Sequence, residues 1–185
     1  RWIGAAARVD LLIVFARDTA DSQVKAFLVP RTTGGVEVTN MTGKVSLRPM
    51  PSGAIRFSDV RVPETARLAR VNSWRDVAGL LCAMRSDVAW IATGLQAGAL
   101  DAALRYVGQR EQFGRPLGGF QLVQEKLARM LGNLTASLGM VVQLSLRQDA
   151  GGYDDANSAL AKMHTARMAR ETVALGREVC GGNGI

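Results

Sequence analysis

The sequence predicts an α+β protein in which a small antiparallel β domain precedes an up-down bundle of long helices. Two observations predict this fold class. Up to Pro63 the apolar residues alternate or form short runs between polar turns, whereas after Trp74 they recur at helical spacing. The 185 residues are 48% hydrophobic and 21% charged, a composition typical of globular proteins. We expect a β domain over residues 1–62, a linker over residues 63–74 and a helical domain over residues 75–185.

The β domain is expected to contain four or more short strands. The runs that predict them are residues 10–16, 24–30, 36–39 and 54–60. The first two runs are separated by the polar turn 18–22. In the last run, alternation predicts that Ile55, Phe57 and Val60 face a core. Short strands joined by such turns predict a small sandwich or barrel.

Three long helices are expected in the second domain. Residues 77–109 lack proline and are rich in alanine and leucine, which predicts one long helix. Steps of four and three residues predict the buried seam of a second helix, formed by Val123, Leu127, Met130, Leu134, Leu138 and Val141. Asp154 or Asp155 is expected to cap a third helix that runs to about Val179 and ends at a pair of glycines. We expect the bundle to be incomplete, with a fourth helix outside this sequence.

Several classes of function are not expected from the composition. The formal charge of +7 comes from arginines spread along the chain without a basic block, so no nucleic-acid partner is predicted. No apolar stretch reaches the roughly 18 residues of a membrane span. Cys82 and Cys180 form no CxxC pair, which indicates a reducing compartment, either the cytoplasm or an organellar matrix. The single histidine, His164, has no second ligand at metal spacing, so no metal site is expected.

Three short segments carry a resemblance to a known family. They are Arg110-Glu111-Gln112-Phe113-Gly114-Arg115 followed by Phe120-Gln121, then Arg177-Glu178-Val179-Cys180-Gly181-Gly182-Asn183-Gly184, and finally Arg1-Trp2-Ile3-Gly4. With these separations the chain resembles the acyl-CoA dehydrogenase family, above all its glutaryl-CoA dehydrogenases and the related short-chain acyl-CoA oxidases. The resemblance covers the whole chain. It implies a middle β domain that lacks its N-terminal part and a C-terminal helical domain that lacks its end.

The resemblance implies that FAD is the cofactor. Arg110 corresponds to an arginine that reaches the FAD pyrophosphate of a neighbouring subunit, and a guanidinium offers phosphate a fixed fork of donors. Gln121 corresponds to a glutamine that contacts the flavin. The residues that correspond to the stretch near the adenine end are Glu178, Val179, Cys180, Gly181 and Gly182. Because these contacts cross between subunits in the family, a homo-oligomer is implied, with a tetramer expected.

The N-terminal segment is also expected to bind the cofactor, through Trp2, Ile3 and Gly4. Trp2 corresponds to an aromatic residue packed against the isoalloxazine ring. The family commonly has threonine or serine at the position of Gly4, with its hydroxyl near flavin N5. The absence of this hydroxyl keeps an oxidase, which passes electrons to oxygen, as an alternative to a dehydrogenase, which passes them to an electron-transfer flavoprotein.

The resemblance implies α,β-desaturation of an acyl-CoA thioester, with a short-chain acyl group or glutaryl-CoA as the substrate. Arg85 corresponds to a substrate-site arginine, and Met84 occupies the position at which some branches carry the catalytic glutamate. Methionine cannot abstract a proton, so no catalytic base is expected in this chain and the base glutamate is expected beyond Ile185. A non-catalytic protein that binds flavin or acyl-CoA is a second alternative.

Overall fold

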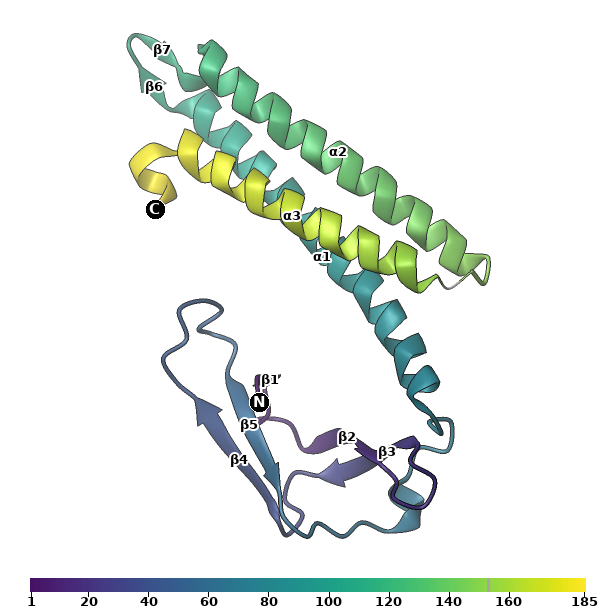
Figure 1. Ribbon diagram of the computed structural model, residues 1–185. Coiled ribbons are helices and arrows are strands. Elements are labelled where there is room, and N and C mark those ends of the chain that lie inside the picture. Colours follow the sequence, from purple (N-terminus) through teal and green to yellow (C-terminus); the bar gives the residue numbers. More distant parts are fainter. Residues whose placement is uncertain (153) are drawn as a thin grey trace. The chain divides into compact units, whose positions relative to one another are not determined.

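The computed structural model describes residues 1–152 and 154–185, which divide into two compact units, Arg1–Val77 and Ala78–Ile185. The first unit contains antiparallel sheets and the second contains long helices (Figure 1). The predicted α+β fold class is therefore confirmed. No helix among the described residues is long and apolar enough to cross a membrane.

The first unit contains two small antiparallel sheets. Their strands are β1 (Ile3–Gly4), β2 (Leu11–Arg17), β3 (Val24–Pro30), β4 (Val36–Met41) and β5 (Ser52–Phe57). One sheet has the order β1-β5-β4, and β2 pairs with β3 in the other. Each of the four expected runs overlaps a strand, with ends that differ by up to three residues. Sequence patterning did not predict β1, because two residues are too few to show alternation.

The predicted inward face of β5 was wrong in part. Phe57 is 42% exposed and ends the strand, so Val60 lies outside it. The buried positions are instead Ser52 and Gly53, at the beginning of β5. Small residues allow a close approach there, since a Cβ atom on Gly53 would lie 2.8 Å from the Cβ atom of Ala6. Apolar alternation does not reveal a buried position that is filled by backbone.

The helical unit contains three long helices and a short hairpin. The helices are α1 (Trp74–Gln109), α2 (Gln121–Asp149) and α3 (Asp155–Val179), and they confirm the three predicted helices. The hairpin strands β6 (Glu111–Gln112) and β7 (Arg115–Pro116) follow α1, and the short 3₁₀ turn η2 (Leu117–Gly119) leads into α2. Asp154 caps α3, because its side chain accepts hydrogen bonds from the backbone N–H groups of Ala156 and Asn157.

Two apolar clusters and a polar layer form the interior of the bundle. One cluster contains Leu100, Ala103, Val107, Met130, Leu175 and Val179, and the other contains Ala89, Val141, Leu144 and Ala161. In the polar layer, Gln96 Nε2 donates to Ser137 Oγ at 3.0 Å and to the Thr165 carbonyl at 3.2 Å. Leu138, predicted in the buried seam of α2, is 45% exposed, whereas Ser137 is fully buried. That prediction was wrong because the hydrogen-bonded serine takes the inward position.

Candidate functional site

The hairpin between α1 and α2 fixes the position of Arg110. The Arg110 N–H donates to the Tyr106 carbonyl at 2.8 Å, and the Arg110 carbonyl accepts the Leu117 N–H at 2.8 Å. The two residues at the hairpin tip, Phe113 and Gly114, have φ values of 54° and 78°. Positive φ at both central residues is the geometry of a type I′ turn, whose twist matches that of the flanking strands. Arg110 therefore lies between the end of α1 and the first strand of a tight hairpin. The hairpin strands β6 and β7 are labelled in Figure 1.

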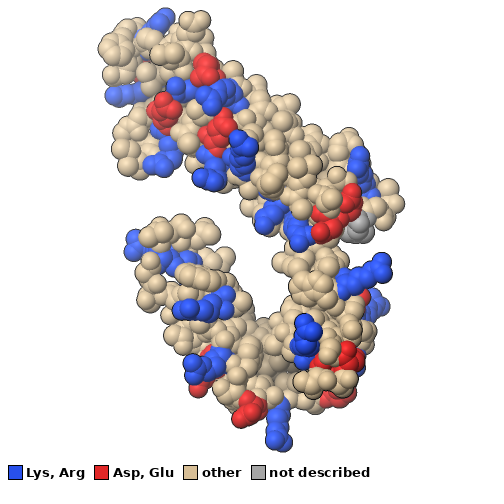
Figure 2. Space-filling view, in the orientation of Figure 1, with Lys and Arg blue, Asp and Glu red and all other residues tan. Residues whose placement is uncertain are grey.

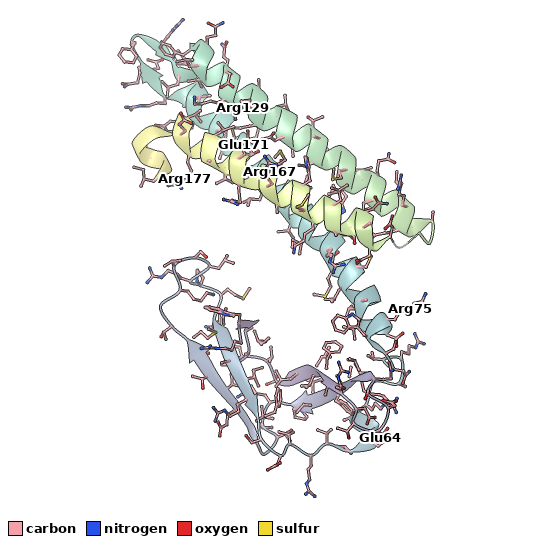
Figure 3. The ribbon with its side chains drawn as sticks, viewed as in Figure 1. Glu64, Arg75, Arg129, Arg167, Glu171 and Arg177 are labelled. Carbon is pink, nitrogen blue, oxygen red and sulfur yellow. The ribbon has the colours of Figure 1, made fainter. Side chains whose placement is uncertain are left out.

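A glycine-rich turn follows α3. Gly181 has a φ of 54°, a left-handed conformation that ends helices and that glycine adopts without steric cost. The next residues form the 3₁₀ turn η3 (Gly181–Gly184). A Cβ atom on Gly184 would lie only 2.1 Å from the Arg177 carbonyl oxygen, so this position has no room for a side chain. Arg177, labelled in Figure 3, donates from Nε to the Gly184 carbonyl at 2.5 Å.

These two segments, far apart in the sequence, line one cavity of about 360 Å³. Its lining residues are Tyr106, Arg110, Gln112, Leu117, Glu178, Val179, Cys180, Gly181, Gly182 and Asn183. Arg110 and the stretch 178–182, which were singled out from the sequence, are therefore brought together. The lining is chiefly polar. We call this cavity the arginine–glycine pocket.

The charges around the arginine–glycine pocket favour an anion. Glu178 forms an ion pair with Lys126, with 3.2 Å between Oε1 and Nζ, so a neighbouring cation balances its charge. Within residues 1–152 and 154–185, no carboxylate lies within ion-pair distance of the Arg110 guanidinium. Arg110 and Glu178 are the two charged residues that line the pocket, and because Glu178 is paired with Lys126, the positive charge of Arg110 is the one left unbalanced. A guanidinium with unused donors is suited to phosphate or carboxylate.

Four of the expected cofactor residues lie outside this pocket. Gln121 is exposed at the beginning of α2 and does not line the cavity. Trp2, Ile3 and Gly4 belong to the first unit, where Ile3 pairs with Gly53 across β1 and β5. Ile3 and Gly4 line a different cavity, of about 480 Å³, together with apolar residues of β2 and β5.

The structure has room for a side chain at Gly4. A Cβ atom there would meet only the Met50 sulfur, at 4.0 Å, which is ordinary van der Waals contact. Packing therefore does not account for the absence of a hydroxyl at this position. Trp2 is 67% exposed and has a φ of 65°, a conformation that non-glycine residues seldom adopt.

Arg85 and Met84 lie side by side in sequence on α1 but differ in their contacts. Arg85 Nη1 donates to Asp155 Oδ1 in an ion pair that links α1 to the first turn of α3. Met84 is 51% exposed. An acidic residue in the first turn of a helix is itself stabilised by the helix dipole, so Asp155 interacts favourably both with its own helix and with Arg85.

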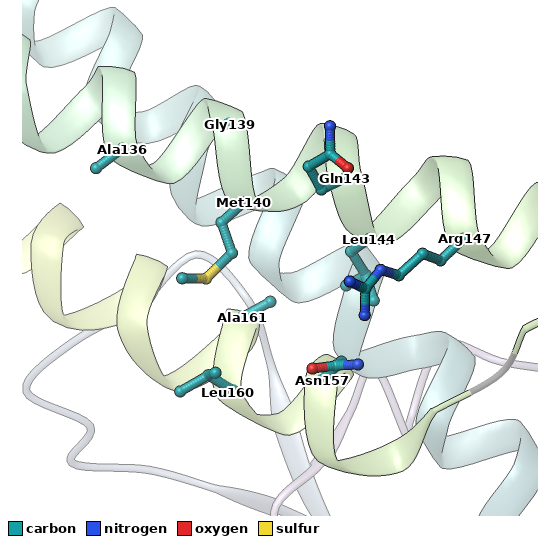
Figure 4. Close-up of a pocket in the computed structure, with 9 residues that line it drawn as sticks. All are labelled: Ala136, Gly139, Met140, Gln143, Leu144, Arg147, Asn157, Leu160 and Ala161. Atoms are coloured by element: carbon teal, nitrogen blue, oxygen red, sulfur yellow. The ribbon is translucent and has the colours of Figure 1, made fainter.

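The remaining surface offers less specific chemistry. A cavity of about 430 Å³ between α2 and α3 is lined mainly by small and apolar side chains, and Arg147 is its one charged residue (Figure 4). Over the described residues, no group of three or more His, Cys, Asp or Glu side chains is placed to hold a metal ion. On the face shown in Figure 2, basic and acidic side chains are interspersed.

Phe113 was not singled out in the sequence as a site residue. It lies at the hairpin tip with 91% of its surface exposed, and its ring meets that of Phe120 edge to face with 6.1 Å between centroids. The Arg115 guanidinium lies over the Phe120 ring at 4.1 Å, a cation–π contact that steadies the hairpin. The usual Asn-Gly signal of a two-residue hairpin is absent here, so the exposed turn was not apparent from the sequence.

Family models decide the relationship of this chain to known proteins. The model of the acyl-CoA dehydrogenase middle domain matches residues 1–60, and the model of the acyl-CoA dehydrogenase C-terminal domain matches residues 74–185. The chain belongs to the acyl-CoA dehydrogenase family. Both parts of the predicted resemblance are thereby confirmed.

Individual family members agree with this assignment. The chain is 30% identical over 170 residues to benzylmalonyl-CoA dehydrogenase of Aromatoleum aromaticum, with 91% of this chain and 45% of that protein covered. It is 30% identical over 167 residues to glutaryl-CoA dehydrogenase of Desulfococcus multivorans, covering 87% and 43% of the two chains. A glutaryl-CoA dehydrogenase from Mycobacterium smegmatis, solved in complex with FADH2, superposes with a TM-score of 0.94 at 29% identity, over 100% of this chain and 47% of that one. The chain spans about half the length of these family members.

Proposed function

We propose that the full-length protein is an FAD-dependent acyl-CoA dehydrogenase, and that the arginine–glycine pocket holds the diphosphate and adenine part of the cofactor. The observation that carries this proposal is the meeting of Arg110 with the backbone of Gly181 and Gly182 in one polar cavity. The structure of the M. smegmatis relative was solved with FADH2, which supports a flavin cofactor for the present protein as well.

The residues of the pocket fit the proposed group. The guanidinium of Arg110 supplies a fork of donors for phosphate oxygens, and the glycines have no side chains to hold a ligand away from the backbone. Ligand pockets commonly enclose about 300–1,000 Å³, so a cavity of about 360 Å³ suits one part of a dinucleotide rather than all of it. We propose that the rest of the cofactor contacts Gln121 and the segment Trp2, Ile3 and Gly4, and that these contacts form in a homotetramer.

The proposed reaction is α,β-desaturation of an acyl-CoA thioester. Bound FAD would accept the β-hydrogen as a hydride while a carboxylate takes the α-proton, which gives an enoyl-CoA and the reduced cofactor. Met84 has no basic group, so we place the proton acceptor on a glutamate C-terminal to Ile185. Arg85 is proposed to provide positive potential near the acyl group, with its guanidinium held at the beginning of α3 by Asp155. We propose glutaryl-CoA or a short-chain acyl-CoA as the substrate, in line with the named activity of the D. multivorans relative.

An oxidase is the second candidate function, and Gly4 is the observation that favours it. A dehydrogenase would pass its electrons to an electron-transfer flavoprotein, whereas an oxidase would pass them to oxygen. Since a Cβ atom fits at position 4, the variant Gly4→Thr is a usable test. In an oxidase, the added hydroxyl should slow reoxidation of the reduced flavin by air.

The proposed function is tested by anaerobic titration of the full-length protein with glutaryl-CoA and then butyryl-CoA, with the visible flavin absorbance as the readout. Bleaching of the flavin supports desaturation, and the rate of recovery in air separates an oxidase from a dehydrogenase. A bound flavin that neither substrate bleaches contradicts the proposed substrates. A protein that binds no flavin contradicts the proposed function as a whole.

The role of Arg85 is tested separately with the variants Arg85→Gln and Asp155→Asn. If Arg85 acts on the substrate, Arg85→Gln should lower the turnover per bound flavin while the flavin content stays unchanged. Asp155→Asn removes the same ion pair but keeps the guanidinium, so it should retain most of the turnover. Equal losses in both variants would show that only the ion pair between α1 and α3 matters.

A further inference from the structure

Tyr106 connects the two walls of the arginine–glycine pocket. It lies on α1 one helical turn before Arg110, and its carbonyl accepts the Arg110 N–H at 2.8 Å. Its ring packs against the apolar cluster that contains Val107, Leu175 and Val179. Its hydroxyl oxygen accepts a hydrogen bond from Asn183 Nδ2 at 3.0 Å. The ring is thus anchored in the core while the hydroxyl reaches the glycine turn.

Asn183 is the only residue of η3 that has a side chain. The other three positions of the turn are Gly181, Gly182 and Gly184. Glycine loses more backbone freedom on ordering than any other residue, so a turn of this composition needs external contacts to hold one conformation. The structure supplies two such contacts, the Arg177 Nε bond to the Gly184 carbonyl and the Asn183 bond to Tyr106.

The two contacts have different consequences for the pocket. Arg177 belongs to α3, so its bond only folds the turn back onto the helix that precedes it. The bond between Asn183 and Tyr106 instead joins the turn to α1, the helix that ends at the base of the Arg110 hairpin. Of these two bonds, only the second joins the turn directly to the helix that precedes Arg110.

We propose that Tyr106 and Asn183 are positioning residues that hold the glycine turn at the distance from Arg110 at which both grip one diphosphate. This inference rests on the proposed function, in which the diphosphate belongs to FAD. The two side chains act through the turn, and the ligand is bound by Arg110 and the glycine backbone. Because the Asn183 side chain is exposed, loss of its bond should weaken ligand binding more than it weakens the fold.

The test measures FAD affinity in the full-length protein by flavin fluorescence, and the affinity for ADP by competition. Tyr106→Phe keeps the ring and removes only the hydroxyl, and Asn183→Leu keeps the approximate size of the side chain. Ser145→Ala is the matched control, since Ser145 also accepts an interhelical bond, from Trp90 Nε1 at 2.9 Å, but lies outside the pocket. One hydrogen bond corresponds to an increase in Kd of about three- to ten-fold.

We expect Tyr106→Phe and Asn183→Leu to weaken FAD and ADP by the same factor, with a midpoint of thermal unfolding equal to that of Ser145→Ala. The double variant should bind no more weakly than either single variant, because one bond is lost in all three. If the wild-type protein binds FAD but Tyr106→Phe binds it with the same Kd as Ser145→Ala, this inference is overturned and the proposed function is not. Effects that add in the double variant would also overturn it. Wild-type protein without FAD affinity would overturn the proposed function and this inference with it.

Discussion

Replacing Gln96 by leucine should destabilise the helical unit although leucine is apolar and of similar size. Gln96 is fully buried, and its side-chain amide forms hydrogen bonds with residues on all three helices. Its Nε2 atom donates to Ser137 Oγ at 3.0 Å, to the Thr165 carbonyl at 3.2 Å and to the Ala92 carbonyl at 3.3 Å, while its Oε1 accepts from Ser137 Oγ at 3.2 Å. Leucine can make none of these bonds.

The size of the expected loss of stability follows from the polar groups that Gln96→Leu leaves without a hydrogen-bond partner. Ser137 is fully buried and would lose its partner, and a stranded buried polar group costs about 1–3 kcal/mol. The added apolar burial offsets part of this cost, at about 0.8 kcal/mol per methylene group. We therefore expect a net destabilisation of about 2 kcal/mol. Ser137→Ala should also be destabilising, because the buried Gln96 Oε1 loses its donor, although Nε2 keeps its bonds to the Thr165 and Ala92 carbonyls.

The double variant distinguishes this explanation from a simple loss of packing. With both polar groups removed nothing is stranded, so the double variant should be more stable than the sum of the single losses predicts, by about 1–2 kcal/mol. Hydrogen exchange read by mass spectrometry on peptides of the three helices measures the opening free energies in the full-length protein. Gln143→Leu, at an exposed position of α2, is the control and should show little change. Strict additivity, or a neutral Gln96→Leu, would refute the reasoning.

Three further predictions concern other parts of the chain. Gly35→Ala should destabilise the first unit more than Gly43→Ala. Both residues have positive φ (88° and 73°), but only at Gly35 would the added Cβ atom clash, because it would lie 2.1 Å from the Ser58 carbonyl oxygen. Thermal unfolding measures the difference in stability, and equal losses of stability would contradict the prediction. A hydrogen bond from Arg129 holds the pKa of Glu171 below its usual range. The stabilisation that the Arg129–Glu171 pair gives to the fold is therefore present above the unfolded-state pKa of glutamate, about 4.3, and is lost as the pH falls through the lower folded-state pKa. Hydrogen-exchange protection of α2 and α3 should fall over this acid range. Arg129→Gln should make the protection depend less on pH there. Gly184→Ala should displace the glycine turn and lower the FAD content of the purified protein. The reason is that the alanine Cβ atom would lie 2.1 Å from the Arg177 carbonyl oxygen. Unchanged FAD content would contradict this prediction.

The long elements were predictable from the sequence because they repeat a simple pattern over many residues. The absence of proline from 77 to 109 predicted α1, and Asp154 was correctly named as a possible cap of α3. The arginine and the glycine stretch of the pocket were assigned to the cofactor through the resemblance to the acyl-CoA dehydrogenase family. Their meeting in one cavity depends on the length and packing of three helices, which no local pattern encodes.

Features that depend on a partner far away in the sequence were not predictable. Ser137 occupies a core position because Gln96 on another helix satisfies its hydroxyl, and apolar periodicity alone assigned that place to Leu138. Likewise, Asn183 lies in the glycine-rich segment and Tyr106 lies 77 residues before it on α1, and only the fold shows that they bond each other. The hairpin was hidden because Phe113 adopts positive φ, which few non-glycine residues do.

The most direct test of the central claim is FAD binding by full-length wild-type protein, by Arg110→Gln and by the control Arg105→Gln. Arg105 is an exposed arginine of α1 that pairs with Asp101 and lies outside the pocket. Loss of a charged hydrogen bond of about 1.5–3 kcal/mol corresponds to a rise in Kd of roughly ten- to one-hundred-fold, so we expect Arg110→Gln to weaken FAD by this factor and Arg105→Gln to match the wild type. An Arg110→Gln protein that binds FAD as tightly as the wild type would contradict the assignment of the arginine–glycine pocket to the cofactor.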